Sequence, residues 1–135
     1  MKNKSIPELK KELLVLQSRW VKLFYSNGSG FTNCFTCGVP MNIDSEFCQT
    51  GHCFSKSGYP ALQFNLDNLR VQCKNCNENL NGNEKVFKER LKDELGEIRF
   101  KKMERIKNDT IKLSRSELAY SIDKTKQKIN QLIID

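Results

Sequence analysis

The sequence has few of the residues on which several common kinds of site depend. Its 135 residues include one histidine, His52, and one tryptophan. One histidine cannot supply a site that needs two imidazole ligands, which excludes a zinc finger of the two-cysteine, two-histidine type. No run approaches the roughly 18 apolar residues of a membrane-spanning helix, so we expect no membrane partner.

Residues 1–7 also lack the apolar stretch that directs secretion. We therefore expect a cytoplasmic protein, and disulfide bonds are rare in that compartment. The length predicts a single domain over residues 1–135 with one modest hydrophobic core. Six cysteines in such a chain are the first feature that needs an explanation.

The positive charge lies at the two ends of the chain. Lysine and arginine number 23 against 16 aspartates and glutamates, which gives a formal net charge of +7. The net charge is +4 over residues 1–30, −1 over residues 31–83 and +4 over residues 84–135. Basic flanks favour nucleic acid as a partner, although a lysine-rich helical surface in contact with water would have the same composition.

Hydrophobic periodicity predicts helices at both ends. Ser5 can cap a helix over residues 5–25, in which apolar side chains recur every three or four positions, at Leu9, Leu13, Leu16, Trp20, Leu23 and Phe24. The basic helical tail over residues 84–135 begins with a helix from Glu84 to Leu95. Its last helix follows the capping-box sequence Ser114–Glu117. That helix could pack on the first one or pair with a second copy in a homodimer.

The cysteines form two C-x-x-C pairs with two cysteines left over. Two such pairs are what a tetrahedral four-thiolate zinc site needs, and this predicts structural zinc at Cys34, Cys37, Cys73 and Cys76. A redox site or disulfide bonds are weaker alternatives, since neither pair lies in a strand-then-helix context of the redox type. Cys48 and Cys53 lack the pair spacing, and could be small buried residues or ligands of a second metal.

His52 lies in an ordered set of polar residues within this cysteine-rich centre. Residues 46–54 and 69–71 are strand candidates, and a helix could begin near Asn75 and carry Asn77. Zinc would then hold the second strand and the helix beside the strand that carries His52. We therefore predict an α+β fold, in which a small zinc-stapled ββα-metal centre over residues 31–83 is flanked by N- and C-terminal α-helices.

Three segments of the centre resemble the HNH endonuclease motif, namely Gly51-His52, Asp67-Asn68-Leu69 and Cys73-Lys74-Asn75-Cys76-Asn77. More narrowly, the chain resembles the NinG/Rap family of phage recombination endonucleases. The resemblance runs from about residue 10 to residue 105. It also includes Cys34-Phe35-Thr36-Cys37-Gly38 and the Gly82-Asn83 pair that follows the second cysteine pair.

The resemblance implies roles for three residues. His52 would be the general base that takes a proton from water, Asn68 would orient the histidine and its loop, and Asn77 would bind a catalytic Mg²⁺ or Mn²⁺ ion. It also implies a DNA substrate, namely branched recombination intermediates, in the cytoplasm of an infected or prophage-bearing bacterial host. The structural zinc would be separate from the catalytic ion.

Gly51 departs from the pattern of many HNH proteins, which place an aspartate or histidine there as a metal ligand. The NinG/Rap pattern shares this glycine. The second ligand of the catalytic ion is therefore left open among Gln49, Cys53, Asp67 and Asn81.

Further residues of the centre have a functional and a simpler interpretation. Lys56 and Arg70 could contact DNA phosphates, or be ordinary surface charges. Asn83 is expected to cap the helix that begins at Glu84. Two other functions compete with the endonuclease: a non-catalytic zinc-stabilised module that binds nucleic acid, and an adaptor whose helical tail binds a protein.

Overall fold

The computed structural model describes residues 3–134 as a mixed α+β fold. Within that range it has four α-helices, α1 (Ile6–Phe24), α2 (Glu84–Leu95), α3 (Glu97–Ile106) and α4 (Arg115–Ile134). Two antiparallel two-stranded sheets are formed by β1 (Phe31–Asn33) with β2 (Pro40–Asn42), and by β3 (Cys48–His52) with β4 (Leu69–Cys73). Among residues 3–134, none of the helices has the length and apolar character to cross a membrane.

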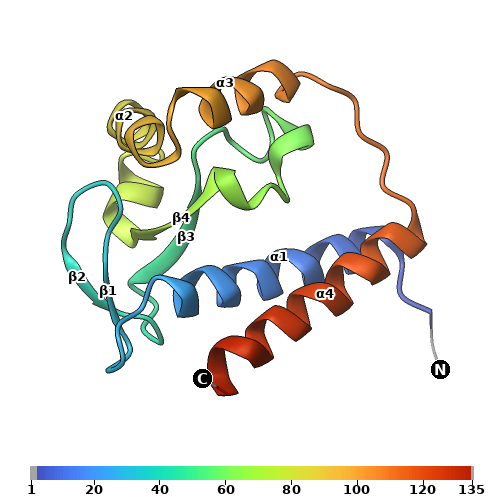
Figure 1. The fold of residues 1–135 in the computed structure, drawn as a ribbon, viewed down its shortest axis with the longest axis horizontal. Helices are drawn as coiled ribbons and strands as arrows, with labels where there is room; N and C mark the ends of the chain where they lie inside the picture. The colour runs from blue at the N-terminus through green and yellow to red at the C-terminus, as the bar shows by residue number, and fades with distance from the viewer. Residues whose placement is uncertain (1–2, 135) are drawn as a thin grey trace.

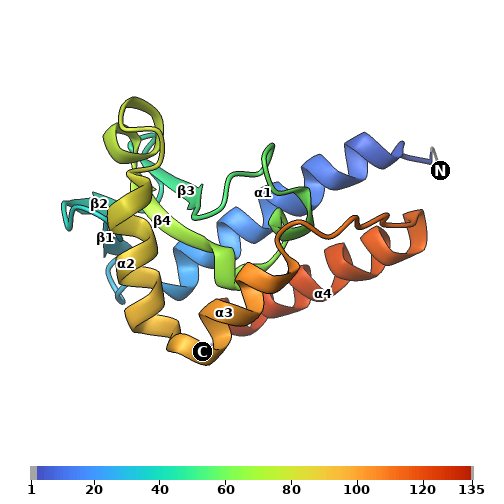
Figure 2. The same cartoon turned by 90° about the horizontal axis from the view of Figure 1, so that it is seen from above.

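The β3–β4 hairpin lies at the middle of the molecule. In Figure 1 the α1–α4 pair lies below it, the α2–α3 pair lies above it, and the β1–β2 hairpin lies to the left. Figure 2 shows the same elements from above, with α2 and α3 at a steep angle to each other. All five residues of β4 are buried, because helices or loops cover both faces of this strand.

Helices α1 and α4 lie side by side and run in the same direction, as both views show. Leu9 and Leu13 of α1 pack against Leu118 and Ile122 of α4 in one buried cluster. The last helix therefore packs on the first helix, which is one of the two arrangements that the sequence left open. A homodimer stays a prediction.

The start signals of both long helices are confirmed. Ser5 accepts a hydrogen bond from the Glu8 backbone N–H, and the Glu8 side chain accepts one from the Ser5 backbone N–H, so both halves of a capping box are present. Ser114 and Glu117 exchange the same two bonds before α4. These bonds satisfy backbone N–H groups that the first turn of a helix otherwise leaves unpaired.

The predicted strands are present, but their lengths differ from the prediction. The pairing of β3 with β4 runs from Cys48 opposite Cys73 to His52 opposite Leu69. After β4, the chain forms a single wide helical turn over Asn75–Asn79, of the π type, where the sequence suggested the start of an α-helix. Such turns arise where an extra residue widens the helix.

The α2–α3 pair forms a second hydrophobic core with the loop after β3. Phe87 and Leu91 of α2 are fully buried there, beside Phe54 and Leu62 of the loop. Phe100 and Met103 of α3 complete the cluster. Two helices thus hold the segment that directly follows His52.

We expect Phe87→Ala to lower the free energy of unfolding by about 3–5 kcal/mol, since it removes a fully buried aromatic ring. Glu89→Ala changes an exposed residue of the same helix and should alter this free energy by less than about 0.5 kcal/mol. Urea unfolding of the zinc-loaded proteins measures both. A Phe87→Ala protein as stable as the Glu89→Ala control would contradict this packing.

Candidate zinc centre and histidine pocket

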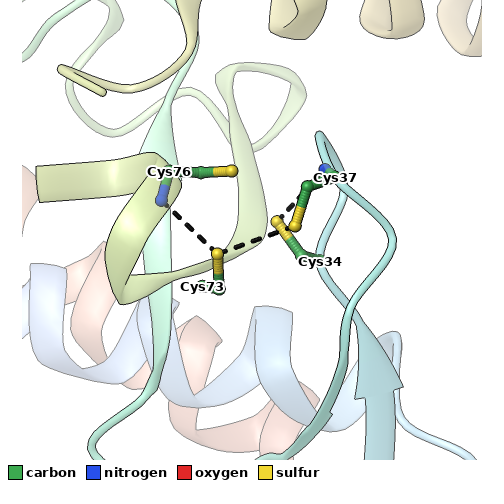
Figure 3. Close-up of side chains that lie close together, drawn as sticks. All are labelled: Cys34, Cys37, Cys73 and Cys76. Carbon is green, nitrogen blue, oxygen red and sulfur yellow. Dashed lines mark hydrogen bonds between the residues drawn. The ribbon is translucent and has the colours of Figure 1, made fainter. Parts of the chain in front are cut away.

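The four cysteines of the two C-x-x-C pairs lie together. Cys34 and Cys37 come from the tight turn between β1 and β2, Cys73 ends β4, and Cys76 lies in the turn that follows (Figure 3). Their sulfur atoms all lie within 4.8 Å of one another. The predicted pairing of the two motifs across the intervening segment is therefore confirmed in the structure.

The spacing of these sulfur atoms fits a four-thiolate site. The Sγ atoms of Cys37 and Cys73 are 3.7 Å apart, and two thiolates of a tetrahedral zinc site with bonds of about 2.3 Å lie ~3.8 Å apart. Gly38, at a φ of 82°, takes the left-handed conformation that completes the first turn. The cluster can hold a metal ion such as zinc.

Hydrogen-bond donors surround the sulfur atoms. The backbone N–H groups of Cys37 and Cys76 donate to the Sγ atoms of Cys34 and Cys73, at 3.5 and 3.4 Å. Burial opposes ionisation of Cys34, but its contacts with the Thr36 hydroxyl and nearby backbone N–H groups outweigh this and lower the thiol pKa to about 6. Burial raises the pKa of Cys73 to about 12.

The Asn83 side chain has a different role from the predicted helix cap. It adopts the left-handed conformation with a φ of 48°, and its side chain makes no capping hydrogen bond to α2. Its Nδ2 group instead donates to Cys76 Sγ at 3.7 Å. Asn83 occupies the N-cap position of α2 as predicted, but the predicted side-chain capping bond is absent, because the amide is turned toward the cysteine cluster, where it can offset thiolate charge.

Cys48 and Cys53 are both buried in apolar surroundings, 1% and 4% exposed. Cys48 belongs to the core between α1 and the two hairpins, and Cys53 to the core beneath α2. Neither joins the four-sulfur cluster or another candidate metal group of the described residues. Both behave as small buried residues, which was the simpler of their two interpretations.

His52 ends β3, and its ring is held by one hydrogen bond. Its Nε2 atom lies 3.0 Å from the backbone carbonyl oxygen of Gln63. A carbonyl oxygen only accepts, so Nε2 carries the hydrogen and Nδ1 keeps its lone pair. Burial lowers the pKa of His52 below its usual 6.5, the bond to Gln63 opposes this shift, and the charge of Lys56 adds to it. The imidazole is therefore a neutral base with a fixed tautomer.

His52 lines a pocket that is open to solvent. The pocket wall also includes Tyr59 of the loop, Asn81 and Gly82 of the segment before α2, and Glu84, the first residue of α2. Glu84 places a carboxylate in the pocket that the sequence analysis did not single out. Its position at the start of a helix gives no signal in the sequence that it shares a pocket with His52.

Asn68 is fully buried and fixes the loop that follows His52. Its Oδ1 accepts from the Phe54 backbone N–H at 2.8 Å, and its Nδ2 donates to the carbonyl oxygens of Phe54 and Leu62 at 2.9 and 3.1 Å. Within residues 3–134, the Asn68 side chain forms no hydrogen bond with the imidazole itself. Asn68 thus orders the loop, while Gln63 of that loop orients the ring.

Asn77 lies against Gly51 on the other face of the hairpin from His52. Its Nδ2 donates to Gln49 Oε1 at 2.8 Å, and its Oδ1 is 3.2 Å from the point where a Cβ on Gly51 would lie. Successive side chains of a strand point to opposite faces, so Gln49 and Gly51 share the Asn77 side and His52 does not. The structure brings both residues to the end of β3, but not into contact.

The four candidates for a second ligand are separated. Gln49 contacts Asn77, whereas Asn81 and the largely buried Cys53 both line the His52 pocket. Asp67 forms an ion pair with Arg99. Of these four, only Gln49 lies beside Asn77, and its Oε1 already accepts from it.

Arg70 belongs to the protein interior and not to a DNA-facing surface. Its side chain is 4% exposed, its Nε pairs with Glu94 Oε2 at 3.2 Å, and its Nη1 donates to carbonyl oxygens of Leu66 and Leu69 at 3.1 and 2.7 Å. The predicted phosphate contact at Arg70 is wrong, because these partners use its donors. Lys56 is exposed beside the His52 pocket, so its predicted role stays open.

The cysteine cluster predicts about one zinc ion per chain. Cys73→Ser should lose the zinc and the folded structure together, since a structural zinc site contributes directly to folding. Cys48→Ala removes an equally buried thiol outside the cluster and should keep the full zinc content. Metal analysis of freshly purified, unchelated protein measures this. Absence of zinc from the wild type, or its loss in both variants, would contradict the assignment.

Comparison with known proteins gives one match. The family model described as Bacteriophage Lambda NinG protein matches residues 4–133. No curated protein and no solved structure matches the chain. The matched range takes in almost the whole sequence, including both cysteine pairs and the histidine pocket. The chain therefore belongs to the family of the bacteriophage lambda NinG protein.

Proposed function

We propose that this NinG-family protein is a metal-dependent DNA endonuclease in which His52 is the general base. The observation that carries the proposal is the state of the imidazole. Its Nε2 is bonded to the Gln63 carbonyl oxygen at 3.0 Å, which leaves Nδ1 as the proton acceptor of a residue that lines an open pocket. A half-buried neutral histidine held in one tautomer is suited to proton abstraction near neutral pH.

The proposed reaction is hydrolysis of a phosphodiester bond. His52 Nδ1 takes one proton from a water molecule, the water oxygen forms the new bond to phosphorus, and the bond to the 3′ oxygen breaks. The Gln63 carbonyl accepts a hydrogen bond from Nε2 throughout, and stabilises the imidazolium that forms. Asn68 keeps the loop carrying Gln63 in place through its backbone bonds.

The residues beside Gly51 fit a hard divalent cation. Asn77 Oδ1 is an amide oxygen that faces the space over Gly51, while its Nδ2 is occupied by Gln49. Amide oxygens suit Mg²⁺ or Mn²⁺, which retain several water ligands in protein sites. Such an ion, held by Asn77, would supply stabilisation of the negative charge on the phosphate and on the leaving oxygen.

Cations around the pocket support a DNA substrate. Lys56 is exposed next to His52, and Lys107 Nζ lies 5.7 Å from the centre of the Tyr59 ring that lines the pocket. Lys88 is paired with the pocket carboxylate of Glu84 at 2.6 Å. Lysine contacts with phosphates position DNA without reading its sequence. We therefore propose selection by DNA structure, with branched recombination intermediates as substrates.

A non-catalytic zinc module that binds nucleic acid is the second candidate. It is favoured by one observation, namely that Gly51 provides no side chain where many HNH proteins have an acidic or histidine ligand. Such a module would bind DNA with salt-sensitive affinity and would cleave no DNA with any metal. A DNA cleavage assay therefore distinguishes the endonuclease from the binding module.

His52→Ala should lower the cleavage rate on branched DNA by about 10²–10⁴-fold, the usual contribution of a general base. Zinc content and DNA affinity should be close to those of the wild type. The assay uses labelled branched and linear DNA with Mg²⁺ or Mn²⁺. Ser57→Ala, in the exposed loop near the pocket, is the control. Cleavage by His52→Ala at the wild-type rate would exclude His52 as the base.

The pH dependence of cleavage should follow the ionisation of His52. Burial lowers its pKa below 6.5, so the unprotonated base forms at a lower pH than in a free histidine. The rate should rise from acid pH, with a midpoint below 6.5, and level off above neutrality. Lys56, Tyr59, Glu84 and Cys53 are the other titratable groups around the pocket, and burial raises the pKa of the Cys53 thiol to about 12. A midpoint above 6.5 at saturating Mg²⁺ would contradict the neutral-base assignment.

A further inference from the structure

The side chain of Gln72 on β4 has a buried oxygen without a partner. Gln72 is fully buried, and its Oε1 has no hydrogen-bond donor among the described residues. Its Nε2 donates to the Gly82 carbonyl oxygen at 2.8 Å and to the Thr36 hydroxyl at 3.1 Å. A buried amide oxygen left unpaired destabilises the folded protein. The presence of this unpaired oxygen on the fully buried strand β4 therefore needs an explanation.

The orientation of the Gln72 amide is fixed by Gly82. Exchanging the Oε1 and Nε2 positions would place an oxygen against the Gly82 carbonyl oxygen, which can only accept. The Oε1 atom consequently points at Gly51, and lies 1.8 Å from the position that a Cβ there would occupy. The glycine is required at this place because any side chain would collide with the amide.

The Asn77 amide is oriented toward the same point by a chain of two bonds. The Glu78 carboxylate accepts from Gln49 Nε2, so Gln49 Oε1 is the atom that accepts from Asn77 Nδ2. Asn77 Oδ1 then faces Gly51, 3.2 Å from the same Cβ position. Two amide oxygens thus face the same glycine, and neither accepts a hydrogen bond within the described part of the chain.

Two converging acceptors repel each other unless a donor or a cation lies between them. A hard divalent cation satisfies both, since amide oxygens are ordinary ligands of such ions. We propose that Gln72 Oε1 supplies the second protein ligand, with Asn77 Oδ1, for the divalent cation of the proposed nuclease. This inference rests on the proposed function, and extends it to a residue that the sequence analysis did not consider.

The proposal also accounts for Gly51. The ligand that many HNH proteins carry on the strand of the histidine would here come from the neighbouring strand, because Gln72 pairs with Gln49 in the β3–β4 ladder. The same Gly82 whose carbonyl holds Gln72 lines the His52 pocket. The proposed ligand is therefore joined to the pocket wall by one hydrogen bond.

Side-chain amide signals in the NMR spectrum test the proposal on the unaltered protein. Small additions of Mn²⁺ to isotope-labelled, zinc-loaded protein should broaden the NH₂ signals of Gln72 and Asn77 first. Gln17 is the internal control, because its Oε1 is also buried and unpaired, while its Nε2 donates to the Phe64 carbonyl oxygen, away from the Gly51 side of the hairpin. Broadening of Gln72 no earlier than Gln17 would overturn the proposal, and would fit a water molecule between the two oxygens.

Two charge-altering variants provide a second measurement. Asn77→Asp adds a carboxylate at the proposed site and should tighten Mn²⁺ binding about tenfold or more, whereas Asn79→Asp adds the same charge to the exposed part of the same turn and should change it little. Gln72→Leu should weaken binding about tenfold or more. Calorimetry or the electron paramagnetic resonance of free Mn²⁺ measures each affinity, with zinc content and circular dichroism as checks of folding.

The outcomes separate this inference from the proposed function. Mn²⁺ binding at Gln72 without cleavage of any DNA would support the cation site and exclude the nuclease. Cleavage that depends on His52, with no broadening of Gln72, would support the nuclease and exclude this ligand. If Gln72→Leu fails to fold, the NMR measurement on the wild type still decides the question.

Discussion

The contact between the Cys34–Cys37 turn and the Cys73–Cys76 segment is the constraint on which the rest of the structure depends. It joins the end of β4 to the β1–β2 hairpin, and so fixes where the following turn and α2 begin. The segment over 38–72 leaves this junction and returns to it carrying β3, the loop and β4. A metal ion at four thiolates would therefore anchor the base of the β3–β4 hairpin, with His52 at its far end.

The hairpin uses its two faces for different purposes. On one face, His52 is held by the loop that Asn68 orders through backbone hydrogen bonds. On the other, Gln72 and Asn77 direct amide oxygens at Gly51. Strand residues alternate between faces, so in the proposed nuclease the base and the cation would reach one phosphate from adjacent positions at the end of β3. Both sets of side chains need only one pair of strands, β3 and β4, to hold them.

The sequence was sufficient to predict the features that depend on local pattern. The helix start signals at Ser5 and Ser114 and the grouping of the four cysteines agree with the structure. The predicted roles of the Arg70 and Asn83 side chains were wrong, because burial against Glu94 and a left-handed backbone are set by distant packing and by turn geometry. Gln72 was missed for the same reason: a glutamine between Val71 and Cys73 carries no local sign that its oxygen is unpaired. The nuclease and its DNA substrate stay predictions.

The parallel packing of α1 on α4 has a consequence for the order in which the chain can fold. The apolar side of α1, with Leu9 and Leu13, finds its partners Leu118 and Ile122 near the other end of the sequence. During synthesis from the N-terminus, α1 leaves the ribosome long before α4 exists. Leu9 and Leu13 therefore have no partners from α4 until that helix has been synthesised. In a chain stalled on the ribosome before α4 is made, the cysteine centre would be present in full and the α1–α4 pair would be missing.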